Sequence, residues 1–125
     1  MNEAFVEGQC YTRKKISEVL GGGTRDFFPH KKGYVVCGCF KKELNPDAPV
    51  EVLPGNTDNI RRRGEVFATQ REAVPIFLKR KPNQWEYVGL WHCVLKTEDT
   101  DEIRARETRA GRDEVSMVLR LEKMQ

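Results

Sequence analysis

The sequence has no long hydrophobic run, and this lack excludes a membrane-spanning helix. Apolar residues make up 38% of its 125 residues but occur only a few at a time, whereas a spanning helix needs about 20 in succession. The segment Met1–Phe5 also lacks a basic stretch followed by an apolar one, so we expect no secretory signal. These absences predict a protein of the cytoplasm or nucleus that has no membrane partner.

Catalytic motifs are missing as well. There is no Gly-x-Ser-x-Gly nucleophile elbow, no phosphate-binding loop with its lysine, and no metalloprotease histidine pair. The run Gly21–Gly23 follows a predicted helix rather than a strand, so it does not read as a phosphate loop. His30 stands among polar residues and His92 in a predicted strand, as ordinary histidines do. We therefore expect no catalysis by this chain and no cofactor.

Cysteine occurs only four times, and no two of the four form a C-x-x-C pair. Structural zinc sites usually contain such pairs, so the spacing argues against a bound metal. Cys37 and Cys39 lie two positions apart in an apolar run and would share one face of a strand. In an intracellular chain we expect small buried thiols here, reduced rather than paired.

Charge, in contrast, is abundant. Charged residues form 33% of the chain, and the net charge is +3. Residues 1–98 carry 16 Lys and Arg against 12 Asp and Glu, whereas residues 99–125 carry 6 against 7. If the fold gathers the basic residues on one side, that side attracts phosphates; otherwise they are solvated ends of loops and strands. The basic clusters are Lys14-Lys15, Lys31-Lys32, Lys41-Lys42, Arg61–Arg63 and Lys79–Lys81.

The spacing of apolar residues predicts more strands than helices and no βαβ repeat. This pattern favours an α+β fold: a small, curled, mainly antiparallel sheet or barrel with about three short helices, in which residues 1–125 form a single domain. Pro75 argues that its strand lies at an edge or that the proline stands at the strand start. The predicted elements are a helix capped by Thr12 and ended by Gly21, strands at 34–40 and 50–53, a helix at 60–69 capped by Asp58 or Asn59, a hairpin of strands at 74–79 and 85–95, a helix capped near Asp99 that ends near Ala110, and a strand at 114–121.

Aromatic residues line one predicted strand. Alternation would place Trp85, Tyr87 and Trp91 on the same face. A pocket for an extruded base needs flat side chains for stacking, groups that read the base edge, and cations for the phosphates. The same aromatic residues could equally fill the core of the barrel.

Short motifs resemble a known family. They match, in order, the N-terminal modules found ahead of HNH nuclease domains in modification-dependent restriction enzymes, and the match covers roughly Val6 to Trp91. Those modules are similar to SRA and PUA-like barrels, which recognise methylated or otherwise modified bases, the SRA group by flipping the base into a pocket. The matching residues are Gly8-Gln9-x-Tyr11-x-Arg13-x-x-Ile16, Gly21-Gly22, Gly55-Asn56-x-x-x-Ile60, Pro75–Leu78 and Tyr87–Gly89.

The resemblance implies a PUA-like or SRA-like domain that binds nucleic acid, DNA with a modified base rather than RNA, with a nuclease as a conceivable partner. Three alternatives stay open: a protein-interaction module on the same barrel, an RNA-binding PUA-like domain, and an enzyme whose acid or thiol site would be assembled from distant residues. A deep aromatic pocket beside clustered arginines would favour the base reader, whereas a flat face with dispersed charge would favour the interaction module. The candidate residues are Arg13, Arg25, Arg61, Arg62 and Arg63 for phosphates, Trp85, Tyr87 and Trp91 for stacking, and Asn45 and Asn56 for reading the base.

Overall fold

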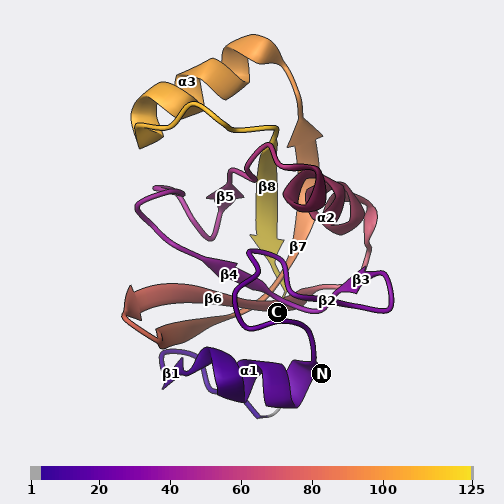
Figure 1. Ribbon diagram of the computed structural model, residues 1–125, viewed down its shortest axis with the longest axis vertical. Coiled ribbons are helices and arrows are strands. Elements are labelled where there is room, and N and C mark those ends of the chain that lie inside the picture. Colours follow the sequence, from indigo (N-terminus) through magenta and orange to yellow (C-terminus); the bar gives the residue numbers. More distant parts are fainter. Residues whose placement is uncertain (1–3, 125) are drawn as a thin grey trace.

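A computed structural model describes residues 4–124 and contains three helices and a six-stranded sheet, with a separate two-stranded ribbon. Helix α1 lies at one end of the molecule and α3 at the other, with the long strand β7 running between them (Figure 1). No helix among the described residues is long and apolar enough to cross a membrane. The elements are β1 (Cys10–Tyr11), α1 (Arg13–Leu20), β2 (His30–Lys31), β3 (Tyr34–Val35), β4 (Gly38–Phe40), β5 (Glu51–Val52), α2 (Asp58–Thr69), β6 (Val74–Lys81), β7 (Gln84–Thr97), α3 (Thr100–Ala110) and β8 (Val118–Lys123).

The sheet curls around β7. Its strand order is β4-β6-β7-β8-β5, with β1 paired to β7 beside this path. All pairs are antiparallel except β4 with β6. The first half of β7 pairs with β6 and β1, and its second half pairs with β8, so the strand carries the sheet from one end of the molecule to the other. The predicted α+β class with a curled sheet and three helices is confirmed; the sheet does not close into a barrel.

Gly89 bends β7 and changes which way its side chains face. Its φ of +105° favours glycine, and the register with β6 shifts at this point, between Pro75 and Phe77. Before the bend, Trp85 and Tyr87 are buried beneath α1 in one apolar cluster; after it, Trp91 packs against a different cluster. The expectation that these three aromatic residues share one face is therefore wrong, because strict alternation does not continue through a bulge.

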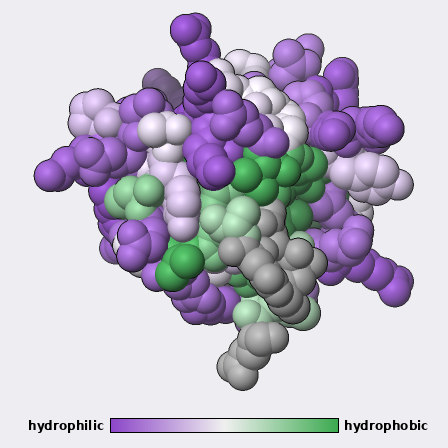
Figure 2. Space-filling model, turned by 90° about the horizontal axis from the view of Figure 1, so that it is seen from below, coloured by the Kyte–Doolittle hydropathy of each residue, from purple (hydrophilic) through white to green (hydrophobic). Residues whose placement is uncertain are grey.

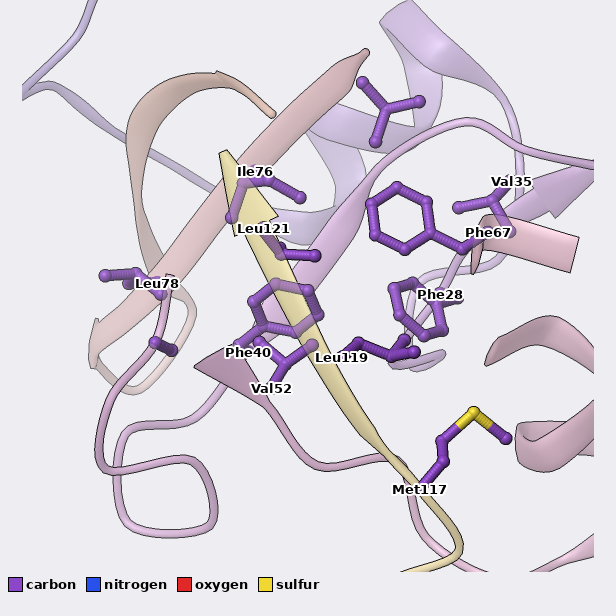
Figure 3. Packing of buried hydrophobic residues seen from close by; sticks show 12 residues of the cluster. Phe28, Val35, Phe40, Val52, Phe67, Ile76, Leu78, Met117, Leu119 and Leu121 are labelled. Carbon is purple, nitrogen blue, oxygen red and sulfur yellow. The ribbon is translucent and has the colours of Figure 1, made fainter. Parts of the chain in front are cut away.

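The main core fills the space between the curled sheet and α2. Its side chains come from strands β3, β4, β5, β6 and β8, from α2, and from the segments before β2 and β5, and they point toward one another (Figure 3). Phe67 on α2 is fully buried and stacks at 5.0 Å, centroid to centroid, on Phe28. A second cluster joins α1 to the other face of β6 and β7 through Ile16, Phe77 and Trp85. Cys37 and Cys39 are buried in this second cluster, as expected.

Local signals predicted the helix ends well. Thr12 caps α1 through its hydroxyl, Gly21 ends α1, and Asp99 caps α3, each as expected. For α2 the cap is Thr57 instead of Asp58 or Asn59, one residue earlier than predicted.

The structure differs from two predictions about strands, one for residues 34–40 and one for the strand that contains Pro75. The strand expected at 34–40 is divided into β3 and β4, since the amides of Val36 and Cys39 bond to the carbonyls of Pro29 and Phe27 instead. Strand β6 is internal rather than an edge, but Pro75 stands near its start. There β4 pairs only with Ile76–Leu78, so no partner on that side requires the missing N–H of the proline.

Candidate nucleic-acid-binding cleft

An open cleft of about 630 Å³ lies between the loop after α1, the end of β4, the turn before α2 and the loop before β8. Its volume falls within the range of about 300–1,000 Å³ that small-molecule sites occupy. The lining residues come from segments far apart in the sequence: Arg13, Thr24, Arg25, Phe27, Cys39, Lys41, Leu44, Asn45, Leu53, Gly55, Asn56, Thr57, Ile60, Lys79, Trp85, Arg112 and Glu114.

The floor of the cleft contains an arginine stacked on an indole. The guanidinium carbon of Arg13 lies 5.1 Å from the ring centroid of Trp85, and Nζ of Lys79 lies 5.9 Å from it. Arg13 is only 8% exposed and Trp85 only 5%. Nη2 of Arg13 donates to the carbonyl oxygen of Asp26 at 3.0 Å and to that of Gly23 at 3.4 Å. The first residue of α1 therefore holds the glycine-rich loop against the cleft.

Cations dominate the lining. Arg25 and Lys41 are exposed at the rim, and neither side chain makes a hydrogen bond or ion pair with another described residue. With Arg13, Lys79 and Arg112 they bring five cationic side chains to the cleft, against one carboxylate, Glu114. A concave site with this charge attracts anions.

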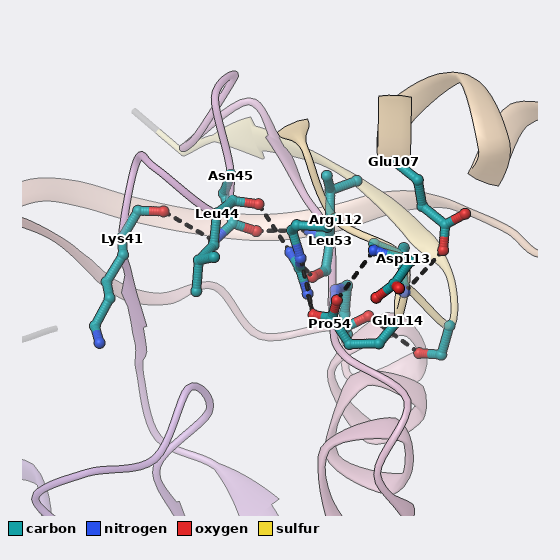
Figure 4. A network of polar contacts seen from close by, with 11 residues as sticks. Lys41, Leu44, Asn45, Leu53, Pro54, Glu107, Arg112, Asp113 and Glu114 are labelled. Carbon is teal, nitrogen blue, oxygen red and sulfur yellow. Dashed lines mark hydrogen bonds and ion pairs between the residues drawn. The ribbon is translucent and has the colours of Figure 1, made fainter. Parts of the chain in front are cut away.

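Arg112 neutralises that carboxylate and fastens the wall. Its Nη2 lies 2.7 Å from Oε1 of Glu114, while its Nη1 donates to the carbonyl oxygens of Leu44 and Leu53 at 2.8 and 2.9 Å (Figure 4). The hydrogen bonds from Arg112 lower the pKa of Glu114, against a smaller opposing effect of burial. Three separate loops are thus joined by one nearly buried guanidinium.

Asn45 forms part of the same wall. It is 1% exposed, its Oδ1 accepts from the Leu53 amide at 2.8 Å, and its Nδ2 donates to the Lys41 carbonyl at 3.0 Å. Both ends of its amide are therefore bonded to backbone, which suits a residue that shapes the cleft. Asn56 is exposed, and its Oδ1 accepts from Nη1 of Arg61 at 2.9 Å, which leaves its Nδ2 without a partner among the described residues.

A smaller hollow of about 190 Å³ adjoins the cleft and shares Arg25, Phe27 and Ile60 with it. On its wall, Nη2 of Arg63 lies 2.6 Å from Nε2 of His30. Because a guanidinium only donates, Nε2 of His30 is the acceptor in this contact. Half-buried Phe27 separates the two hollows and presents the one aromatic ring that lines both.

The structure gathers part of the predicted set and disperses the rest. The cleft contains Arg13, Arg25, Asn45, Asn56 and Trp85, and the adjoining hollow contains Arg63. The remaining four line neither space: Arg61 pairs with Asp58, Arg62 is exposed on α2, Tyr87 is packed against Phe5 and Phe77, and Trp91 donates from Nε1 to the Val88 carbonyl.

Sequence reasoning missed most of the other lining residues, among them the aromatic ring of Phe27 and three of the five cations, Lys41, Lys79 and Arg112. Lys41 and Lys79 belong to basic clusters visible in the sequence, but only the fold shows which clusters face the cleft. Arg112 lies beyond the segment that carries the family resemblance. Among the described residues, no group of three His, Cys, Asp or Glu is placed to hold a metal ion, and all four cysteines are free.

The fold is similar to that of a solved structure. It is described as the SUVH5 SRA domain in complex with hemi-methylated CG DNA, and it aligns with a TM-score of 0.62 over 99% of this chain and 91% of its own, at 11% sequence identity. At this identity the likeness establishes the SRA-like fold alone. A search of curated proteins found no match to the sequence.

The sequence itself assigns the chain to a family. Residues 10–117 match the family described as "Domain of unknown function (DUF6697)". That range runs from β1 to the segment just before β8 and contains every residue that lines the cleft. The chain therefore belongs to the DUF6697 family, whose fold, as this structure shows, is SRA-like.

Proposed function

We propose that this chain acts as a single nucleic-acid-binding domain that recognises DNA carrying a modified base and has no catalysis of its own. The observation that carries the proposal is the cleft, in which five cationic side chains surround one carboxylate already paired with Arg112. A polyanion supplies the charge that such a surface lacks.

Two further observations support DNA. The fold is similar to that of an SRA domain described in complex with hemi-methylated CG DNA. The cleft also combines the groups that an extruded base requires: rim cations for phosphates, and the half-buried ring of Phe27 beside a concave space. A volume of about 630 Å³ leaves room for one base with its sugar rather than for a duplex.

The proposed role of each candidate residue follows from its depth in the cleft. Arg25 and Lys41 at the rim bind phosphates, together with Arg61, Arg62 and Arg63 of α2. Phe27 stacks on the base, Trp85 supports the floor from below, and Asn56 offers its free Nδ2 to a base edge or phosphate. Asn45, Tyr87 and Trp91 act through the shape of the site, because they are bonded or packed inside the domain. A nuclease partner stays a prediction of the sequence resemblance.

One observation favours the alternative of a protein-interaction module. On the face seen from below Figure 1, apolar residues gather in a central area inside a hydrophilic rim (Figure 2). Exposed apolar side chains such as Val6, 58% exposed, occur in the described part of the chain. Such an area is typical of a protein contact.

Fluorescence-polarisation titrations at two salt concentrations test the proposal. The probes are matched short duplexes with unmodified, methylated or hydroxymethylated cytosine, and an RNA of the same sequence. We expect the tightest binding to a modified duplex, and a preference that survives the higher salt. Equal and salt-sensitive binding to all probes would mean that the protein binds nucleic acid through its basic surface without recognising a modified base. Tighter binding to RNA would favour the RNA-binding alternative. No binding at low salt would favour a protein partner.

Two single variants test where the nucleic acid lies. Arg25→Gln removes a rim cation, and Arg104→Gln removes an equal charge from exposed α3, outside both hollows. We expect Arg25→Gln to reduce the slope of log affinity against log salt by about 1. Arg104→Gln should leave that slope unchanged; equal effects of the two variants would contradict binding in the cleft.

A further inference from the structure

The guanidinium of Arg13 is buried without a counter-ion. No carboxylate of the described residues lies within ion-pair distance of it. Only Nη2 is bonded, to two main-chain carbonyls. Nε is enclosed and unpaired, whereas Nη1 has no partner and is not among the enclosed atoms. Three of the five N–H donors that an arginine carries are thus left over.

This arrangement is costly unless something completes it. A buried charge is normally paired, because removing it from water costs several kcal/mol that only an opposite charge and good hydrogen bonds recover. The indole of Trp85 recovers part of the cost through its face. Lys79 adds a second cation near the same ring, which increases the local positive charge. The floor of the cleft therefore favours an anion.

The depth of Arg13 in the cleft indicates which part of a ligand it can contact. The rim cations Arg25 and Lys41 are exposed, where a nucleic-acid backbone passes. Arg13 shares the floor with Trp85 and Cys39, which are 5% and 3% exposed, so only a group that enters the cleft reaches it. An inserted methyl group would gain nothing from a guanidinium and would leave its donors unpaired.

We propose that the ligand group reaching the floor carries an anionic oxygen, which Arg13 binds through Nη1. This inference rests on the proposed function and names its substrate class: a nucleotide whose inserted part is acidic. Two sources supply this chemistry, a carboxylate on the base, as in 5-carboxycytosine, and a phosphate of an extruded or terminal nucleotide. Charge-assisted hydrogen bonds to such a group are about twice as strong as neutral ones.

The first test uses the unaltered protein. Fluorescence polarisation compares matched duplexes in which one cytosine is unmodified, methylated, hydroxymethylated or carboxylated, and a further duplex with a terminal phosphate. We expect the carboxylated or the phosphorylated duplex to bind about tenfold more tightly than the methylated one, as a hydrogen bond to a charged group implies. Whichever binds more tightly identifies the source. Methylated DNA binding as tightly as both would overturn the proposal.

Variants then assign the effect to Arg13. Arg13→Lys keeps the charge but loses the planar fork, Arg13→Gln loses both, and Arg104→Gln is the control of equal charge change. We expect both Arg13 variants to lose the preference for the acidic duplex and Arg104→Gln to keep it. A preference that persists in Arg13→Gln, with its fold verified by circular dichroism, would overturn the proposal. Should Arg13→Gln fail to fold, Arg13→Lys gives the same comparison.

Free ligands separate this inference from the proposed function. 5-Carboxy-dCMP, dCMP and inorganic phosphate are titrated in a thermal-shift assay with the unaltered protein and Arg13→Lys. If no duplex binds, the DNA function fails, but stabilisation by 5-carboxy-dCMP or phosphate that Arg13→Lys lacks would uphold the anion site. If duplexes bind but no probe depends on Arg13, the DNA function stands and the anion site is refuted. If no duplex binds and no free ligand stabilises the protein, both the DNA function and the anion site are refuted.

Discussion

Replacing Arg112 tests whether one side chain holds the wall of the cleft together. Arg112→Met keeps most of the aliphatic stem and removes the guanidinium, whose Nη1 bonds the carbonyls of Leu44 and Leu53. The whole side chain is 7% exposed, so water does not simply replace it. Its loss frees two backbone acceptors in the wall and leaves Glu114 unpaired.

The magnitude follows from these contacts. A hydrogen bond from a charged donor contributes about 1.5–3 kcal/mol, and the two carbonyl bonds share one donor atom, so their effects overlap. Glu114 is 53% exposed, so its ion pair adds at most about 1 kcal/mol. We expect Arg112→Met to lower the free energy of unfolding by about 2–4 kcal/mol. Urea denaturation followed by circular dichroism measures this difference.

A matched arginine provides the control. Arg109 pairs with Asp47 at 2.6 Å, but its side chain is 60% exposed and it makes no bond to backbone. Arg109→Met should therefore cost less than about 1 kcal/mol. If Arg112→Met costs no more than Arg109→Met, the burial and the two carbonyl bonds do not stabilise the wall, and the reasoning fails.

Other consequences of the structure can be measured in the same assay. Because Arg112 lowers the pKa of folded Glu114, the ionised carboxylate stabilises the fold at pH values above its unfolded pKa of about 4.3, and this stabilisation is lost as the pH falls through the lower folded pKa. Glu114→Gln should therefore flatten that part of the curve of stability against pH. An unchanged curve would contradict the pairing with Arg112. Gly89→Ala should cost about 1–2 kcal/mol, because φ is +105° and the added Cβ would lie 2.7 Å from Cε of Lys123; a neutral effect would mean that the bend is not required. Phe67→Ala should cost about 3–5 kcal/mol in urea, since the ring is fully buried between α2 and the sheet, and a cost below 1 kcal/mol would contradict that packing.

Local chemistry in the sequence was enough to predict the helices. Thr12 and Asp99 cap helices because their side chains accept from amides three residues later, and Gly21 ends one because glycine adopts positive φ. These signals depend on a few adjacent residues. The fold class followed from the number and spacing of the strands, together with the family resemblance.

The predictions that failed depended on contacts between distant residues. Alternation along β7 placed Trp91 with Trp85, but at Gly89 the register against β6 shifts, and no local signal in β7 shows this shift. The cleft likewise combines α1, β4, α2, β6, β7 and four loops, so no window of sequence contains it. Arg13 was predicted as a phosphate contact, and nothing local shows that Trp85 and the carbonyls of Gly23 and Asp26 enclose it.

Depth within the cleft separates residues that build it from residues that meet a ligand. Arg112 and Asn45 bond main-chain groups of their neighbours, so their replacement should reduce stability first and binding as a consequence. Arg25 and Lys41 have no partner among the described residues, so their replacement should change binding and its salt dependence at nearly constant stability. Arg13 belongs to both groups, because Nη2 holds the glycine loop while Nη1 is left over. Only at this residue do we expect stability and ligand preference to change together, and a variant that loses stability but keeps the preference for the acidic ligand would refute the anion site.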